Sequence, residues 1–105
     1  MPLLIAVGEN GEEFRLQGEI GHSVKDALLA GGVPGILGLC GGSAACGTCH
    51  VYVDPVMYAA VGAPGANEAA MLAASSHQWW NSRLACQIRI TDALDGLRVV
   101  VAPLE

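Results

Sequence analysis

The sequence predicts an α+β fold in which a small mixed β-sheet packs on a helix. Two observations support this fold class. Short segments with apolar alternation or β-branched residues occur at both ends of the chain, which is typical of strands. Between them lie two segments with helical spacing, each preceded by an N-cap or proline–glycine signal. A chain of 105 residues has the size of one domain, so we expect residues 1–105 to form a single domain.

The chain begins with a predicted hairpin. Leu3 to Val7 is a short apolar segment, and Glu9-Asn10-Gly11 is a tight-turn signal. Glu13 to Gln17 then returns, and alternation places Phe14 and Leu16 on one face. We therefore expect two antiparallel strands.

The first helix is predicted by its capping residues. Ser23 is the expected N-cap, and Asp26 lies three residues later, as the partner in a capping box does. The helix should end near Gly31-Gly32, because glycine is favoured after a helix C-terminus. Its apolar stripe consists of Val24, Ala27 and Leu28.

A strand and a second helix are expected in the middle of the chain. Cys49 to Val53 reads as a strand leaving a glycine-rich loop. After Pro64-Gly65, Asn67 to Ser75 is the expected helix, with Asn67 as its N-cap. Glu68 would then lie near the positive end of the helix dipole.

Two further strands are predicted near the C-terminus. Leu84 to Ile90 and Leu97 to Val101 are rich in β-branched residues, and Asp95-Gly96 provides a turn before the second of them. Asp92 and Asp95 are interpreted as solvated turn residues.

No nucleophile–base pair, phosphate-binding loop or carboxylate pair stands out, so the pattern favours a carrier over an enzyme.

Composition and charge exclude several classes of protein. Residues 27–53 carry no Asp, Glu, Lys or Arg, but their glycines and proline forbid a regular membrane helix. The net charge of −5 disfavours nucleic acid as a partner, because phosphate binding needs a basic face. We see neither a signal peptide nor a transit peptide, and therefore expect a soluble protein in a bacterial cytoplasm. Within residues 27–53, the residues that interrupt a regular helix are Gly31, Gly32, Pro34, Gly35, Gly38, Gly41, Gly42 and Gly47.

Four cysteines follow the pattern C-x5-C-x2-C-x36-C, at Cys40, Cys46, Cys49 and Cys86. Three thiols within ten residues, with a fourth returned by the fold, can surround a two-iron, two-sulfide cluster with two thiolates on each iron. A zinc site usually has paired C-x-x-C motifs, and here only Cys46 and Cys49 have that spacing. A disulfide framework would need an oxidising compartment. The spacing favours the [2Fe-2S] cluster and leaves zinc and disulfides as alternatives.

Around these cysteines the chain resembles the adrenodoxin/putidaredoxin branch of the [2Fe-2S] ferredoxins. The resemblance rests on C-G-G-S-A-A-C-G-T-C-H-V at residues 40–51 and S-R-L-A-C-Q-I at residues 82–88. Plant-type ferredoxins have four residues, not five, between the first two ligands. The resemblance implies a β-grasp sheet, one [2Fe-2S] cluster held by the four cysteines, and a monomeric one-electron carrier that is not an enzyme.

Small and polar residues surround the cysteines in the loop. The backbone N–H groups of glycines can point at sulfur, and hydrogen bonds to sulfur raise a cluster's reduction potential. His50 follows the third ligand directly, and the resemblance implies that it ties the cluster loop to the rest of the fold. A surface histidine is the alternative. The residues expected next to the ligands are Gly41, Gly42, Gly47, Thr48 and His50.

The expected docking surface departs from the family in its charge. Family members carry several acids around a Met-Leu pair in the helix before the fourth cysteine, whereas here Met71-Leu72 is retained and Glu68 is the sole acid. Of Trp79 and Trp80, we expect one indole to pack inward and the other to anchor a partner; packing of both in the core is the alternative. The residues expected to contact partners are Leu39, Ser43, Glu68, Met71, Leu72, Trp79 and Trp80.

The resemblance implies two classes of function. In the first, the protein passes electrons from a flavin-dependent ferredoxin reductase to a terminal oxygenase. The oxygenase is either a Rieske-type dioxygenase of aromatic hydrocarbon catabolism or a haem-thiolate cytochrome P-450 monooxygenase, and the depleted acidic helix favours the Rieske type. In the second, the protein serves iron–sulfur cluster biogenesis, although ferredoxins of that class tend to keep the acidic helix.

Overall fold

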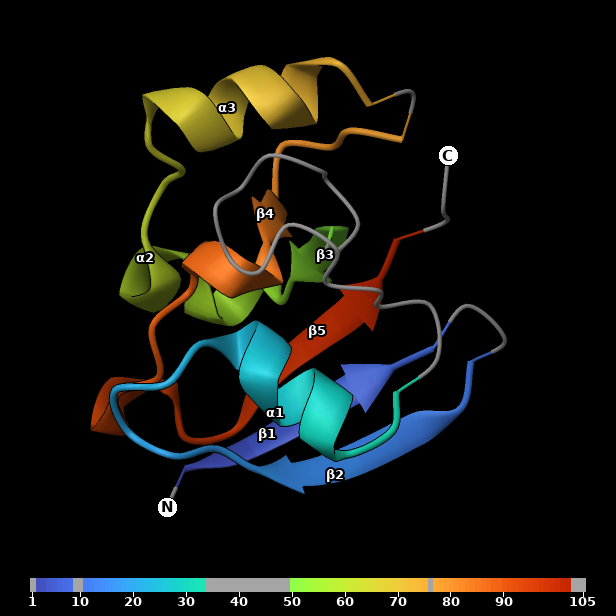
Figure 1. Cartoon of the computed structure of the whole chain (residues 1–105), viewed down its shortest axis with the longest axis vertical. Helices are drawn as coiled ribbons and strands as arrows, with labels where there is room; N and C mark the ends of the chain where they lie inside the picture. Colours follow the sequence, from blue (N-terminus) through green and yellow to red (C-terminus); the bar gives the residue numbers. More distant parts are fainter. Residues whose placement is uncertain (1, 9–10, 34–49, 76, 103–105) are drawn as a thin grey trace.

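The computed structural model describes residues 2–8, 11–33, 50–75 and 77–102 (Figure 1). Their elements comprise strands, α-helices and short 3-10 turns. The strands are β1 (Leu3–Val7), β2 (Glu13–Gln17), β3 (His50–Val53), β4 (Ser82–Leu84) and β5 (Leu97–Val101). The helices are α1 (Val24–Ala30), α2 (Tyr58–Val61) and α3 (Ala66–Ala73), and the 3-10 turns are η1 (Pro55–Met57), η2 (Ala85–Gln87) and η3 (Asp92–Leu94).

The described strands form one mixed sheet in the order β2-β1-β5-β3-β4. β1 pairs in parallel with β5, whereas β1–β2, β3–β5 and β3–β4 are antiparallel. Helix α1 lies against the sheet, and α3 lies beyond β4 at the top of the view (Figure 1). This confirms the predicted α+β class, a mixed sheet packed on a helix.

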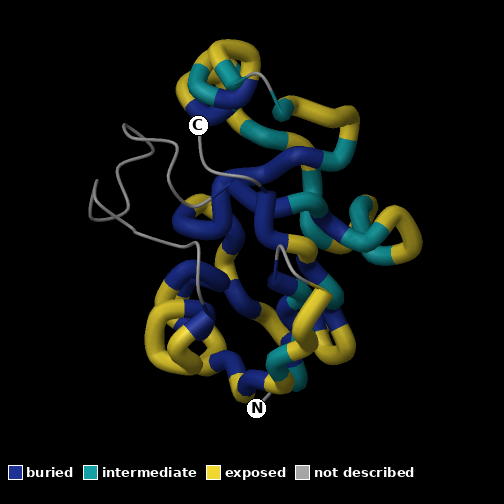
Figure 2. The backbone as a smooth tube through the Cα atoms, turned by 90° about the vertical axis from the view of Figure 1, so that its right-hand side faces the viewer, coloured by how far each residue is buried: buried dark blue, intermediate teal, exposed yellow. Residues whose placement is uncertain are grey.

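The core forms between α1 and one face of the sheet. Alternate residues of β1 and β5 are buried, so each strand turns one set of side chains towards the helix. Leu4, Val99 and Val51 belong to the same buried cluster as Leu28 of α1. Buried backbone accordingly runs through the middle of the molecule, with exposed segments at its edges (Figure 2).

The start and end of α1 agree with the sequence prediction. The Ser23 Oγ accepts a hydrogen bond from the Asp26 backbone N–H, and the Ser23 N–H donates to Oδ2 of Asp26, each at 3.2 Å. This hydrogen bond from the Ser23 N–H holds the pKa of Asp26 below its ordinary value, because it stabilises the charged carboxylate. The helix ends at Ala30 with Gly31 as C-cap, where a Cβ would lie 2.1 Å from Cδ2 of Leu16. A larger residue at this position would require the Leu16 side chain to move.

The predicted second helix was shifted from its true position. Helix α3 spans Ala66–Ala73 and its N-cap is Gly65, which makes no side-chain hydrogen bond. Asn67 is already inside the helix, so its assignment as N-cap was wrong. The extended backbone of Gly65 starts the helix instead, with φ −73° and ψ 177°.

The predicted strand from Leu84 to Ile90 was also wrong as a single element. Pairing of β4 with β3 ends at Leu84, opposite His50, and the chain then forms the 3-10 turn η2. Beyond it, the backbone bonds to the start of α1: the Val24 N–H donates to the Ile88 carbonyl at 2.9 Å. The segment thus joins the sheet to α1 rather than extending the sheet.

Several turns have structural roles that the sequence left open. Asp95 accepts a hydrogen bond from the Leu3 N–H at 2.7 Å, so it is more than a solvated turn residue. Gly96 has φ 87°, in the left-handed region that favours glycine. Glu9 and Asn10 of the expected first turn, and Cys49 of the expected middle strand, lie outside the described residues. Among the residues that are described, no helix is long and apolar enough to cross a membrane.

Candidate metal centre

Cys86 is a free, buried thiol in the middle of η2. Its residue is 8% exposed, and the turn packs against α1. Ala85 and Leu84, which precede it, are fully buried, so the thiol is held by a rigid segment between β4 and α1. A thiol fixed in this way meets the requirement for a structural metal ligand.

The other three predicted ligands lie outside the described residues, in the range 34–49. The same holds for the expected neighbours of the ligands other than His50, and for two expected docking residues. Accordingly, no group of three metal-binding side chains gathers within the described part of the chain. The predictions in this range concern Leu39, Cys40, Gly41, Gly42, Ser43, Cys46, Gly47, Thr48 and Cys49.

His50 lies in the interior and is part of a hydrogen-bond chain. Its Nε2 lies 2.7 Å from Oγ of Ser82 on the neighbouring strand β4, and that Oγ also accepts the Trp79 backbone N–H at 2.9 Å. Since a hydroxyl both donates and accepts, it can bond either tautomer of the imidazole. The burial of His50 contradicts the alternative of a merely surface histidine.

Strand β3 also holds the segment that leads from α3 to β4. The Tyr52 hydroxyl donates to the His77 carbonyl at 2.6 Å, and the Asn81 side chain donates to the Val53 carbonyl at 2.8 Å. The rings of Tyr52 and His50 meet edge to face, with centroids 5.1 Å apart. The strand that begins at His50 therefore fixes the segment carrying both tryptophans.

A buried ion pair joins α3 to the segment before Cys86. The Arg83 guanidinium donates to both carboxylate oxygens of Glu68, at 2.6 and 3.0 Å, and the Leu84 N–H donates to Oε2 at 2.8 Å. Arg83 also donates to the carbonyl of Gly62 at 2.7 Å. Glu68 is only 4% exposed, so the expectation that it contacts partners was wrong: its carboxylate is used inside the protein.

The remaining predicted docking residues fall into two groups. Leu72 is buried in the core, which contradicts its expected place on the surface, whereas Met71 is partly exposed. Trp79 and Trp80 are 65% and 63% exposed, so the expectation that one indole packs inward was wrong. The Trp80 ring is tilted against Tyr58, with centroids 5.4 Å apart.

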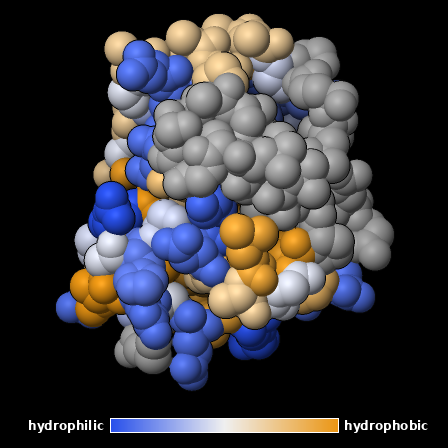
Figure 3. Space-filling model, in the orientation of Figure 1, coloured by the Kyte–Doolittle hydropathy of each residue, from blue (hydrophilic) through white to orange (hydrophobic). Residues whose placement is uncertain are grey.

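The surface of α3 carries little charge. Its only charged residue, Glu68, is buried, and alanines provide half of its residues. Mostly weakly hydrophobic residues accordingly appear over this helix at the top of Figure 3. Helix α3 itself therefore has no exposed acid with which to attract a basic partner.

Sequence reasoning missed three residues around Cys86: Ser82, Arg83 and Gln87. Ser82 binds His50, Arg83 binds Glu68, and the Gln87 side chain donates to Sγ of Cys86 at 3.5 Å. All three belong to the segment S-R-L-A-C-Q-I, in which Cys86 is the one residue predicted to be functional. An arginine three residues before the predicted ligand Cys86 was the available signal, because a guanidinium buried beside it would require a partner.

The donor set fits a two-iron cluster. A cluster of this kind needs four thiolates, the chain has four cysteines, and the described one is buried without a disulfide. Its Sγ accepts a hydrogen bond from the Gln87 side-chain amide, and an N–H donor suits a negatively charged sulfur ligand.

Comparison with known proteins identifies relatives over nearly the whole chain. The family described as "2Fe-2S iron-sulfur cluster binding domain" matches residues 7–91. The chain is 46% identical over 87 residues to Ferredoxin CarAc of Sphingomonas sp, covering 83% of this chain and 80% of that protein. It is 39% identical over 102 residues to putidaredoxin of Pseudomonas putida, covering 96% of this chain and 95% of that protein.

A solved structure gives the same result for the fold. A chain in the crystal structure of the covalent putidaredoxin reductase–putidaredoxin complex superimposes with a TM-score of 0.91 and 38% identity. The match covers 97% of this chain and 99% of that chain.

Proposed function

Because this chain belongs to the adrenodoxin/putidaredoxin-type [2Fe-2S] ferredoxins, electron-transfer proteins with one [2Fe-2S] cluster, we propose that it carries single electrons from a flavin-dependent ferredoxin reductase to a terminal oxygenase. The observation that carries the proposal is its match, over almost its full length, to a chain of a reductase–putidaredoxin complex. The absence of a nucleophile–base pair or phosphate loop from the sequence agrees with a carrier.

The cluster ligands in this proposal are Cys40, Cys46, Cys49 and Cys86. When bound, the cluster accepts and releases one electron. The chain holds the thiolates in place, and backbone or side-chain donors bond the sulfurs. We propose Gly41, Gly42, Gly47 and Thr48 as donors in the loop. His50, through Ser82, would tie the end of this loop to β4.

The proposed docking surface is apolar rather than acidic. It comprises Leu39, Ser43, Met71, Trp79 and Trp80. Leu72 and Glu68 support it from within the protein, by packing and by the ion pair to Arg83. Exposed tryptophans are effective anchors for a partner, because they bury large areas while fixing few torsion angles.

Among possible electron acceptors, the uncharged α3 favours a Rieske-type dioxygenase of aromatic catabolism over a cytochrome P-450. The same feature disfavours the second candidate, a ferredoxin of iron–sulfur cluster biogenesis, since the burial of Glu68 leaves α3 with no exposed acid. The proposed setting is the bacterial cytoplasm.

The cofactor assignment is tested on protein purified without air. We expect two irons and two acid-labile sulfides per chain, and an electron spin resonance signal that appears only after one-electron reduction. Changing each of the four cysteines to alanine should remove or destabilise the cluster. Stoichiometric zinc in a colourless protein, or a cysteine variant with an unchanged cluster, would contradict the assignment.

The partner assignment is tested by stopped-flow oxidation of the reduced protein. A Rieske-type oxygenase should oxidise it faster than a cytochrome P-450 or a cluster-assembly scaffold does. Between 0.01 and 0.15 M ionic strength, where the Debye length falls from about 30 to about 8 Å, the rate should change at most a few-fold. Trp79→Ala, Trp80→Ala or Met71→Ala should lower it more than the exposed-acid control Glu12→Gln. A steep salt dependence with inert tryptophan variants would overturn the proposed surface.

A further inference from the structure

The side chain of Gln87 reaches back over the thiol of Cys86. Its Nε2 lies 3.5 Å from Sγ, which is hydrogen-bond distance for a sulfur acceptor. Gln87 itself is exposed, whereas Cys86 is buried. The amide therefore lies on the solvent side of the sulfur.

The backbone of Gln87 is held on both sides. The Ile88 N–H closes η2 by donating to the Ala85 carbonyl at 3.3 Å, and Arg83 donates to the Gln87 carbonyl at 3.4 Å. The next carbonyl, of Ile88, accepts the Val24 N–H. Because the turn is fixed by β4 and α1, the backbone from which the Gln87 amide extends is in place before any partner binds.

A donor at this position has a defined effect on a sulfur ligand. Reduction adds one negative charge to the cluster and its thiolates, so an N–H···S bond is stronger in the reduced state than in the oxidised state. Hydrogen bonds to ligand sulfurs are among the factors that set the potential of iron–sulfur clusters, and donors raise it.

We propose that Gln87 donates a hydrogen bond to the cluster ligand Cys86 and thereby raises the reduction potential of the cluster. The inference rests on the proposed function, because it takes Cys86 as a ligand. It adds a side-chain donor on the solvent side of Cys86 to the backbone donors expected in the loop.

The experiment measures the midpoint potential of the holoprotein by dye-coupled titration. Gln87→Leu removes the donor and keeps most of the side-chain volume, while Gln87→Glu keeps the shape and adds a negative charge. We expect Gln87→Leu to shift the equilibrium with the dye three- to tenfold towards the oxidised cluster. At 59 mV per tenfold for one electron, this lowers the midpoint potential by about 30–60 mV. Gln87→Glu should shift it further in the same direction. The control is Gln17→Leu, an exposed glutamine on β2, which should leave the potential unchanged.

A second readout uses the wild-type protein. Pulsed electron–nuclear double resonance of the reduced cluster should show an exchangeable proton that disappears in Gln87→Leu but not in Gln17→Leu. The inference would be overturned if both Gln87 variants hold a full cluster content and have the wild-type midpoint potential. If neither variant retains a cluster, the test moves to wild-type protein labelled with ¹⁵N in the glutamine side-chain amides. Coupling of this nitrogen to the reduced cluster would then support the inference, and its absence would overturn it. Cluster retention by Cys86→Ala would instead overturn the ligand assignment.

Discussion

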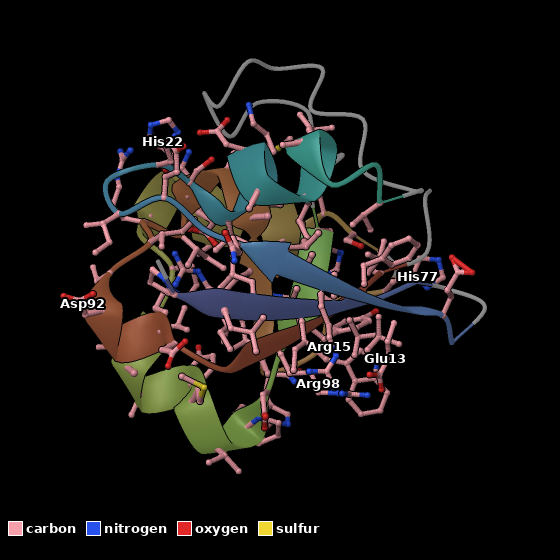
Figure 4. The ribbon with its side chains drawn as sticks, turned by 90° about the horizontal axis from the view of Figure 1, so that it is seen from below. Glu13, Arg15, His22, His77, Asp92 and Arg98 are labelled. Atoms are coloured by element: carbon pink, nitrogen blue, oxygen red, sulfur yellow. The ribbon has the colours of Figure 1, made fainter. Side chains whose placement is uncertain are left out.

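The two halves of the sheet are stabilised in different ways. In the half formed by β1, β2 and β5, polar side chains stay at the surface, as shown by the exposed Arg98–Glu13 pair at 2.9 Å (Figure 4). In the half formed by β3, β4 and α3, polar side chains lie in the interior. They are His50, Glu68, Ser82 and Arg83.

This difference indicates where the protein tolerates change. The first half depends on apolar packing, which accepts volume-conserving substitutions at small cost. The second half depends on partners for buried polar groups, and removing one partner leaves the other desolvated and unsatisfied. The second half also leads into Cys86 and contains His50, so the more sensitive region is the one next to the proposed ligand Cys86.

The largest expected effect comes from breaking the buried ion pair. Arg83→Met leaves the Glu68 carboxylate without its main partner, and we expect the free energy of unfolding to fall by about 3–5 kcal/mol. Urea unfolding followed by circular dichroism measures this. The double variant Arg83→Met/Glu68→Leu should recover part of the loss, because it removes the buried charge but also removes the partners of the Gly62 carbonyl and the Leu84 N–H. A single variant as stable as the wild type would show that the pair contributes little to the stability of this half.

The next effect concerns His50. His50→Ala removes one of the two hydrogen-bond partners of the Ser82 hydroxyl in the interior, and we expect a loss of about 1–3 kcal/mol while the cluster is retained. Thermal unfolding of the holoprotein is the measurement. His22→Ala is the matched control, because His22 pairs with Glu19 at the surface and its loss should matter little. Equal melting curves for both variants would contradict a bracing role for His50.

A smaller effect, dependent on pH, is expected at the start of α1. The pKa of Asp26 is lower in the folded than in the unfolded protein, so its carboxylate stabilises the fold above the ordinary pKa of about 3.9. This contribution is lost as the pH falls through the folded-state pKa. The Asp26 side chain is about half exposed, so water screens the interaction, and Asp26→Asn should lower stability at pH 7 by less than about 1 kcal/mol. The difference from wild type should shrink towards pH 2. A difference that does not change with pH would exclude the carboxylate as its cause.

The smallest effect is expected at the exposed pair of the first half. Arg98→Ala should change the free energy of unfolding by less than about 1 kcal/mol, since both side chains are nearly half exposed to water and salt. The same urea titration used for Arg83→Met measures it. A cost as large as that of Arg83→Met would remove the contrast between the two halves.

The sequence was most informative where structure is local. The hairpin, the capping box of Ser23 and Asp26, and β5 follow from alternation and capping signals within a few residues. The burial of Glu68 could not be read in this way, because it depends on Arg83, which is fifteen positions away. The turn at Cys86 likewise forms because the following residues bond to α1 instead of continuing along β3.

At the site, the cysteine spacing was enough to favour the cofactor. It did not show the contacts of Ser82 with His50 and of Arg83 with Glu68, since these arise only when β4 lies between α3 and β3. The sequence pattern also could not predict that both tryptophans are exposed. Alternation places neighbouring side chains on opposite faces only within an extended strand, whereas Trp79 and Trp80 lie before β4.

The strand order also determines when this protein can fold during synthesis. β5 is the last described strand along the chain, yet it lies at the centre of the sheet, between β1 and β3. Neither neighbour has its central partner until β5 has left the ribosome, and such distant pairing is slow to form. All four cysteines precede β5 in the chain and are synthesised before it. Nascent chains therefore present their thiols before the sheet is complete. We expect cluster insertion to await, or to accompany, the closing of the sheet.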